Sequence, residues 1–182
     1  MEKETIRIGF LGIGSMGFAM CCGLHKSGYR MVLPYYRKDR DILKGYSELA
    51  PDRDTKNALF EQMLREGAEA AESQAALIKS SDILVTSLPT SKQVEDLVYA
   101  PDGILACAKE GTVVIDTTTA DPSSTRRVAA SLEEKGISFL DAPVSGGTRG
   151  AAGQTLSIMV GGRKDVFDRM LPLLQTLGAP GK

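Results

Sequence analysis

Short apolar segments alternate with helical segments along almost the whole chain, and this alternation limits the fold more than any other feature. Segments 82–88 and 112–116 are largely apolar on both faces, as strands are when helices cover both sides of a sheet. Segments 16–27 and 121–135 carry the apolar spacing of helices. Because strands and helices alternate, the sequence predicts an α/β fold with a doubly wound, mainly parallel sheet and helices on both faces.

Amino-acid composition excludes several classes of protein. The 182 residues include 23 acidic and 22 basic side chains, and the net charge of −1 argues against a nucleic-acid binder. The single histidine, His25, leaves no multi-histidine metal site, so we expect no metal. Three cysteines make no disulfide framework, and no apolar run reaches the roughly 18 residues of a membrane helix. Since the first residues also show no signal-peptide pattern, we expect a cytoplasmic protein without a membrane partner.

A glycine-rich turn joins the first strand to the first helix. The turn consists of Gly12, Ile13, Gly14, Ser15, Met16 and Gly17, which is a G-x-G-x-x-G pattern. Its first glycine permits a tight turn, its second lets the backbone approach a pyrophosphate, and its third lets the helix pack close to the strand. The free N–H groups at the start of a helix attract phosphate oxygens. Because the pattern lies between a strand and a helix, as it must, it predicts a dinucleotide-binding site in a Rossmann-like fold.

The end of the second strand bears on which dinucleotide binds. NAD-binding domains usually place an acidic residue there to hold the ribose 2′-hydroxyl. In segment 33–40 of this chain, the first acidic residue is Asp39, and it is flanked by the basic residues Arg37, Lys38 and Arg40. A guanidinium group pairs well with the two oxygens of a 2′-phosphate. The sequence therefore favours NADP as the cofactor, with NAD as the alternative that Asp39 keeps open.

Four motifs follow one another along the chain. They are residues 9–17, Leu88 with Pro89, residues 116–119 with Pro122, and residues 141–147 with the glycines and apolar residues of segment 150–162. Together they resemble the motifs of the β-hydroxyacid dehydrogenases, a family that includes 3-hydroxyisobutyrate dehydrogenase and tartronate semialdehyde reductase, and the similarity runs from about residue 6 to residue 178. The resemblance implies a Rossmann-like N-terminal domain, here residues 1–162, followed by the start of a connection, residues 163–182, to a helical second domain.

The two middle motifs imply contacts to the nicotinamide half of the cofactor. By position, Leu88, Pro89 and Gln93 would lie along it. Thr118 or Thr119 would contact the nicotinamide or its ribose, although these threonines also fit a plain strand end.

The fourth motif implies a substrate-binding loop. Ser145, Gly146 and Gly147 would hold the carboxylate and hydroxyl of a small β-hydroxyacid, because a hydroxyl and successive N–H groups suit an anion. A plain turn is the alternative. We interpret Asp141, at the start of this motif, as a buried carboxylate that caps the loop rather than as a catalytic acid.

The chain departs from the family in three places. Segment 37–67 is longer than usual, and Gln154 stands where the family usually has glycine. The family's proton-transfer lysine lies on a later helix, so we expect it beyond residue 182 and assign no catalytic residue in this chain. A positioned acid or base contributes about 10²–10⁴-fold to such a reaction. We therefore expect the 182 residues, as a truncated form, to be nearly inactive alone.

The resemblance implies an oxidoreductase that transfers a hydride between NAD(P) and a small β-hydroxyacid or its semialdehyde. Two alternatives stay open: a non-catalytic dinucleotide-binding sensor or partner-binding module, and an imine-reductase-like enzyme with another proton donor. We expect the full-length protein to be a homo-oligomer. Without the second domain, the first domain should expose apolar surface near residues 171–177.

Overall fold

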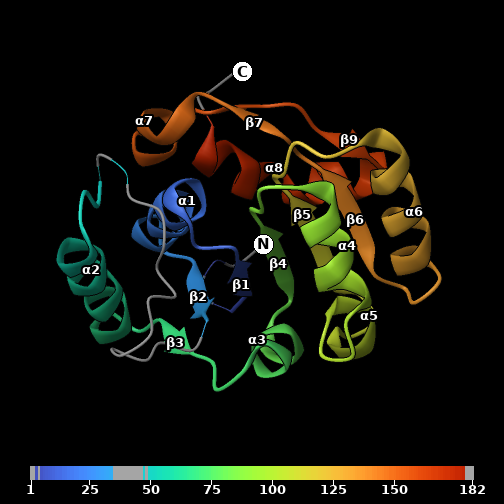
Figure 1. Cartoon of the computed structure of the whole chain (residues 1–182), viewed down its shortest axis with the longest axis horizontal. Helices are drawn as coiled ribbons and strands as arrows, with labels where there is room; N and C mark the ends of the chain where they lie inside the picture. The colour runs from blue at the N-terminus through green and yellow to red at the C-terminus, as the bar shows by residue number, and fades with distance from the viewer. Residues whose placement is uncertain (1–2, 4, 35–46, 48, 179–182) are drawn as a thin grey trace.

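A seven-stranded sheet forms the centre of the molecule (Figure 1). The computed structural model describes residues 3, 5–34, 47 and 49–178. The strand order is β3-β2-β1-β4-β5-β6-β9, with β9 antiparallel to β6 and the other pairs parallel. The strands are β1 (Arg7–Leu11), β2 (Arg30–Leu33), β3 (Glu69–Ala70), β4 (Ile83–Thr86), β5 (Val113–Asp116), β6 (Ser138–Asp141) and β9 (Gly161–Gly162). A separate antiparallel pair joins β7 (Val144–Ser145) to β8 (Ser157–Ile158). The predicted fold class is confirmed.

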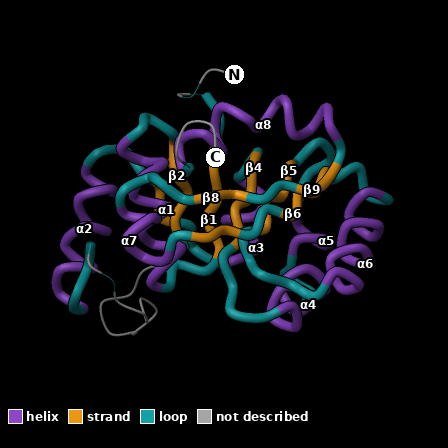
Figure 2. The backbone as a smooth tube through the Cα atoms, turned by 90° about the horizontal axis from the view of Figure 1, so that it is seen from above, coloured by secondary structure: helices purple, strands orange, loops and turns teal. Residues whose placement is uncertain are grey.

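Helices cover both faces of the sheet. Seen from above in Figure 2, α8 lies on one side of the strands, while α3 and α4 lie on the other. The helices are α1 (Ser15–Lys26), α2 (Arg53–Arg65), α3 (Gln74–Ser80), α4 (Ser91–Tyr99), α5 (Ile104–Cys107), α6 (Pro122–Glu133), α7 (Gly147–Ala152) and α8 (Lys164–Leu177).

Alternating side chains on the central strands divide the core into two. Ile83 and Val85 of β4 belong to the cluster that includes buried residues of α1, α2 and α8. Leu84, between them, belongs to the cluster that includes residues of α3, α4, α5 and α6. Val113, Val114 and Ile115 of β5 repeat this pattern. Successive strand side chains point to opposite faces, so a strand buried on both sides must be apolar throughout.

Side-chain caps fix where four of the eight helices in the described residues begin. Ser73, Thr90 and Asp121 accept hydrogen bonds from the first turns of α3, α4 and α6. Asp52 caps α2 in the same way, by accepting from Thr55 N at 2.7 Å.

Helix α8 corrects one expectation about the surface. It continues through Pro172 to Leu177, and Leu173, Leu174 and Leu177 are buried in the core of this same domain. The apolar surface expected near residues 171–177 is therefore largely covered by the domain itself. In the described part of the chain, the large apolar side chains with most exposure are Tyr99 and Met159.

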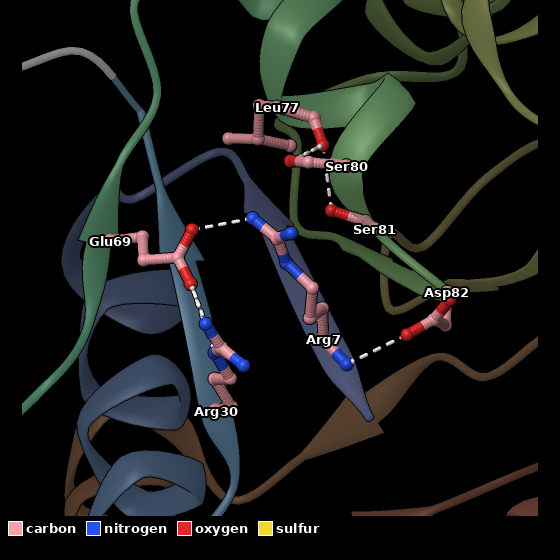
Figure 3. A network of polar contacts seen from close by, with 7 residues as sticks. All are labelled: Arg7, Arg30, Glu69, Leu77, Ser80, Ser81 and Asp82. Carbon is pink, nitrogen blue, oxygen red and sulfur yellow. Dashed lines mark hydrogen bonds and ion pairs between the residues drawn. The ribbon is translucent and has the colours of Figure 1, made fainter. Parts of the chain in front are cut away.

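Charged side chains join the amino ends of three strands (Figure 3). Glu69, at the start of β3, accepts from Arg7 Nη2 of β1 and from Arg30 Nη2 of β2, both at 2.5 Å. Asp82 accepts from the backbone N–H of Arg7 at 2.9 Å. These residues tie the edge strand β3 and its neighbour β2 to the centre of the sheet. The network lies at the amino ends, so the carboxyl ends of the strands are free of it.

Gln154 fastens α7 to two other helices. Its backbone has φ of +55°, a left-handed conformation that glycine adopts more easily. Its side-chain Nε2 lies 3.2 Å from Gly23 O of α1 and 2.9 Å from Thr176 O of α8, and 3.1 Å from Ser27 Oγ. The glutamine therefore replaces the conformational ease of glycine with hydrogen bonds between helices.

Substitutions at Gln154 should separate these two effects. Gln154→Ala keeps the left-handed backbone and loses the amide contacts, so we expect the free energy of unfolding to fall by about 1–3 kcal/mol. Gln154→Gly relieves the backbone and should recover about 1 kcal/mol of that loss. Urea denaturation of the three proteins measures both differences. A glycine variant more stable than the parent would show that the amide contacts stabilise the fold by less than the left-handed backbone costs.

Candidate functional site

The carboxyl ends of four strands stand in one row across the sheet. Strand register pairs Leu11 of β1 with Thr86 of β4, Thr86 with Asp116 of β5, and Asp116 with Asp141 of β6. The loop after each strand therefore leaves the sheet at the same edge. The strand order reverses between β1 and β4, and in sheets of this kind ligands bind in the crevice at that point. All four predicted motifs lie at these strand ends. The first spans the end of β1 and the second follows β4. The third and fourth begin at the last residues of β5 and β6.

The glycine turn is packed too tightly for any side chain at its first and third glycines. Gly12 has φ of +92°, and a Cβ atom there would lie 2.2 Å from Ser87 O. A Cβ atom on Gly17 would lie 1.9 Å from Gly12 O. The two contacts hold the turn against the loop after β4 and hold α1 against the turn. These are the roles that the first and third glycines have in a dinucleotide-binding turn, namely the tight turn itself and the close packing of the helix.

The start of α1 suits an anion. Gly14 is its N-cap residue and gives no side-chain cap, and no acidic residue lies in the first turn. The first N–H groups of a helix have no acceptor inside the helix, and the helix dipole places partial positive charge there. Gly14, Ser15 and Met16 are partly exposed, whereas Ile13 is buried in the core. The turn thus fits the diphosphate of a dinucleotide through its backbone.

The loop after β4 lies beside the turn. Ser87 N donates to Leu11 O at 2.9 Å, and Leu88 is half-buried. Pro89 and Gln93 are exposed on the same side, at and just after the start of α4. Gln93 Oε1 accepts from Thr90 Oγ1 at 3.0 Å, so its side chain also contributes to the helix cap. The structure thus brings Leu88 next to the turn.

Asp116 connects the loops after β4 and β5. Its Oδ1 accepts from Thr86 Oγ1 at 2.7 Å and from Thr118 N at 3.1 Å. Asp116 is buried, and among the described residues its Oδ2 has no hydrogen-bond partner. Burial raises the pKa of this carboxyl group, although the hydrogen bonds from Thr118 and Thr86 oppose that rise. A buried carboxylate with one unpartnered oxygen favours its protonated form.

The two threonines of the third motif have different environments. Thr118 is buried, and its Oγ1 accepts from Leu88 N at 3.0 Å, which joins the loops after β4 and β5. Thr119 is exposed at the edge of the sheet. Of the two predicted nicotinamide contacts, Thr119 is therefore the more accessible to a ligand, and Thr118 shapes the loop from below.

The predicted substrate loop is exposed at the same edge. Ser145 ends β7, and Gly146 and Gly147 have φ of +135° and +62°, which glycine adopts without strain. All three are exposed. Asp141 is half-buried, and no hydrogen bond to its carboxylate is found within the described residues, so its role as a loop cap stays a prediction. Burial and the nearby Asp116 charge raise the pKa of Asp141.

Segment 37–67 contains two predicted site residues and one that the sequence did not indicate. Arg37 and Lys38, predicted to select the cofactor, lie outside the described residues. Lys56 of α2 was expected to lie on a solvated segment, but it is buried and its Nζ donates to Ile13 O of the glycine turn at 2.8 Å. Its spacing with Phe60 and Met63, at i, i+4 and i+7, could have placed it on a buried helix face.

The described residues offer little support for a membrane or metal site. Within the ranges that the structure describes, no helix is both long and apolar enough to cross a membrane. The same residues contain no group of three or more His, Cys, Asp or Glu side chains that could hold a metal ion. Cys21 and Cys22 are buried and form no disulfide, and burial raises the pKa of Cys22 to about 11. The candidate site therefore lies at the strand-end edge.

Known proteins resemble this chain over nearly its whole length. Residues 7–181 match the family model described as the NAD binding domain of 6-phosphogluconate dehydrogenase. A curated relative, 2-(hydroxymethyl)glutarate dehydrogenase of Eubacterium barkeri, is 38% identical over 178 residues, which are 98% of this chain and 52% of that protein. The chain thus spans about half the length of the curated relatives it matches.

Solved structures agree. The 3-hydroxyisobutyrate dehydrogenase of Mycobacterium tuberculosis with L-serine superposes with a TM-score of 0.75 at 29% identity, covering 95% of this chain and 52% of that one. Psf3 in complex with NADP+ and 2-OPP gives a TM-score of 0.76 at 29% identity, covering 94% of this chain and 54% of that one. The resemblance to hydroxyacid dehydrogenases is confirmed. The chain belongs to the family of the NAD binding domain of 6-phosphogluconate dehydrogenase and is an NAD(P)-binding domain of the kind that hydroxyacid dehydrogenases contain.

Proposed function

We propose that this domain serves an oxidoreductase that transfers a hydride between NAD(P) and a small β-hydroxyacid or its semialdehyde. The observation that carries the proposal is the single edge at which the loops after β1, β4, β5 and β6 meet. The bound nicotinamide would supply the hydride chemistry, and the protein would position it. Residues 163–182 would lead toward a second, helical part that supplies the proton-transfer lysine and completes the homo-oligomer. A cytoplasmic location suits its three free cysteines.

Each loop would have its own role in binding. The glycine turn would hold the diphosphate through backbone N–H groups, because its glycines leave no room for side chains. Leu88, Pro89, Gln93 and Thr119 would lie along the nicotinamide half, with Thr118 holding Leu88 in place. Ser145, Gly146 and Gly147 would face the substrate acid, since they are exposed beyond β6 at the same edge.

We also propose that the enzyme prefers NADP, because Arg37 and Lys38 follow β2 where the ribose of the adenosine would bind. The test is a side-by-side fluorescence titration with NADPH and NADH at one stated salt concentration. Arg37→Ala should weaken NADPH binding about tenfold or more, because a charge-assisted hydrogen bond is worth about 1.5–3 kcal/mol. NADH binding should change little.

Arg53→Ala is the matched control for this titration. Arg53 starts α2 and is exposed, and its contact with Asp54, at 3.5 Å, is a weak one. Its removal should leave both affinities unchanged. Equal losses of NADPH and NADH affinity in Arg37→Ala would contradict the preference for NADP. Failure of the folded domain to bind either cofactor would contradict the proposed function itself.

A further inference from the structure

Lys56 occupies a position where a helix normally carries an apolar side chain. It shares one face of α2 with Phe60 and Met63, and all three are buried against the core. Only 1% of Lys56 is exposed. Lysine is almost never fully buried unless its charge is compensated, because removing an ammonium group from water is costly. A buried lysine on this face therefore indicates a specific task.

The contacts of Lys56 lead to the glycine turn. Its Nζ donates to Ile13 O at 2.8 Å and lies 5.0 Å from the centre of the Phe18 ring on α1. A cation over an aromatic ring is stabilised by the negative face of the ring. The ammonium thus bridges α2, the start of α1 and the middle of the turn.

The bond to Ile13 O fixes the orientation of a peptide group. In a trans peptide, the carbonyl oxygen of one residue and the N–H of the next lie in one plane and point in opposite directions. No cis peptide bond occurs among the described residues. Because Lys56 holds the oxygen of the Ile13–Gly14 peptide on the α2 side, the Gly14 N–H points away from α2. Gly14 is the second glycine of the pattern, where the backbone approaches a pyrophosphate.

We propose that Lys56 is a positioning residue for the cofactor diphosphate and acts through the Ile13–Gly14 peptide. Its hydrogen bond keeps the Gly14 N–H aimed at the phosphate before the cofactor arrives. This inference rests on dinucleotide binding at the turn and adds to it a residue from α2, which lies within the long segment 37–67.

The test compares the parent chain with Lys56→Met. Methionine has a similar length and is apolar, so the variant loses the Nζ donor to Ile13 O. We expect the dissociation constant for NADH to rise about tenfold, which corresponds to about 1.4 kcal/mol. In amide NMR spectra, the Gly14 signal should lose much of the shift that NADH causes in the parent chain. Lys56→Arg restores a donor for the Ile13 carbonyl and should bind NADH within about threefold of the parent.

Met63→Ala is the matched control. Met63 lies on the same buried face of α2, and its sulfur contacts Cys22 Sγ, away from the turn. It should lower thermal stability without changing NADH affinity or the Gly14 shift. If Lys56→Met lowers stability but leaves NADH affinity and the Gly14 shift unchanged, the lysine is only structural and the inference is wrong.

The remaining outcomes are also decisive. If Lys56→Met does not fold, Lys56→Arg decides, because a tenfold loss of NADH affinity in a folded arginine variant would contradict the inference. If the folded parent chain binds no NADH, the proposed dinucleotide binding at the turn is wrong. If the parent binds NADH and Lys56→Met binds it equally well, only the inference about Lys56 is wrong.

Discussion

Gly17→Ala should raise the dissociation constant for NADH about 100-fold or more and lower the free energy of unfolding by about 1–3 kcal/mol. The new Cβ atom would lie 1.9 Å from Gly12 O, and a backbone oxygen cannot move aside without displacing the turn. Alanine in a helix interior is normally favoured over glycine by about 1 kcal/mol. A loss in spite of this preference would arise from the close approach of α1 to the turn. Fluorescence titration and urea denaturation measure the two effects.

Gly23→Ala makes the same substitution further along the same helix. Its Cβ atom would meet Gln154 Cγ at 3.2 Å, and a flexible side chain can shift by a few tenths of an ångström. We expect NADH affinity within about threefold of the parent chain. Parent-like NADH binding by Gly17→Ala would show that the turn is not the diphosphate site.

Asp116→Ala should lower the free energy of unfolding by about 2–4 kcal/mol. It leaves Thr86 Oγ1 and Thr118 N without their acceptor, and each buried unsatisfied donor costs about 1–3 kcal/mol. The loops after β4 and β5 would loosen, so cofactor affinity should fall as well. Asp116→Asn keeps an oxygen for both donors, so it should lose less stability than Asp116→Ala. Urea denaturation of the three proteins compares them.

The pH dependence of these proteins tests the protonation of Asp116. Burial raises its pKa, so at pH values just above the unfolded pKa of about 3.9 Asp116 binds its proton more strongly in the folded chain than in the unfolded chain. Stability from this group is therefore full below the unfolded pKa and is lost as pH rises through the raised folded pKa. Asparagine does not titrate, so Asp116→Asn should gain stability relative to the parent as pH rises. It should also lower the pKa of Asp141, since it removes a nearby negative charge. Parallel stability curves for parent and variant would contradict this assignment.

Local sequence signals were enough for the main elements of the fold. The caps Ser73, Thr90 and Asp121 and the two-sided apolar strands act within a few residues, so the chain alone reveals them. The edges of the sheet lacked such signals. Strands β3 and β9 have two residues each and exist because a longer neighbour pairs with them. Pro172 interrupts the helical pattern in the sequence, but packing in the core keeps α8 continuous through it.

The candidate site was predictable where its residues act through the backbone. The glycine pattern gave the turn, because only glycine fits there. Lys56 and Asp116 were missed because their roles depend on residues 43 and 30 positions away, which the register of the folded chain brings close. Gln154 was noted as a departure, but its amide contacts with α1 and α8 follow from tertiary packing alone.

Amide NMR of this chain during titration with NADH tests the central claim, that the strand-end edge binds the cofactor. We expect the largest shifts at Gly12, Gly14 and Gly17, at Leu88, and at Thr119. A different result would place the shifts at the amino ends of the strands, for instance at the cavity of about 620 Å³ that His25, Lys26, Tyr29 and Arg30 help to line. Shifts confined to that cavity, or no shifts in a folded chain, would contradict the account.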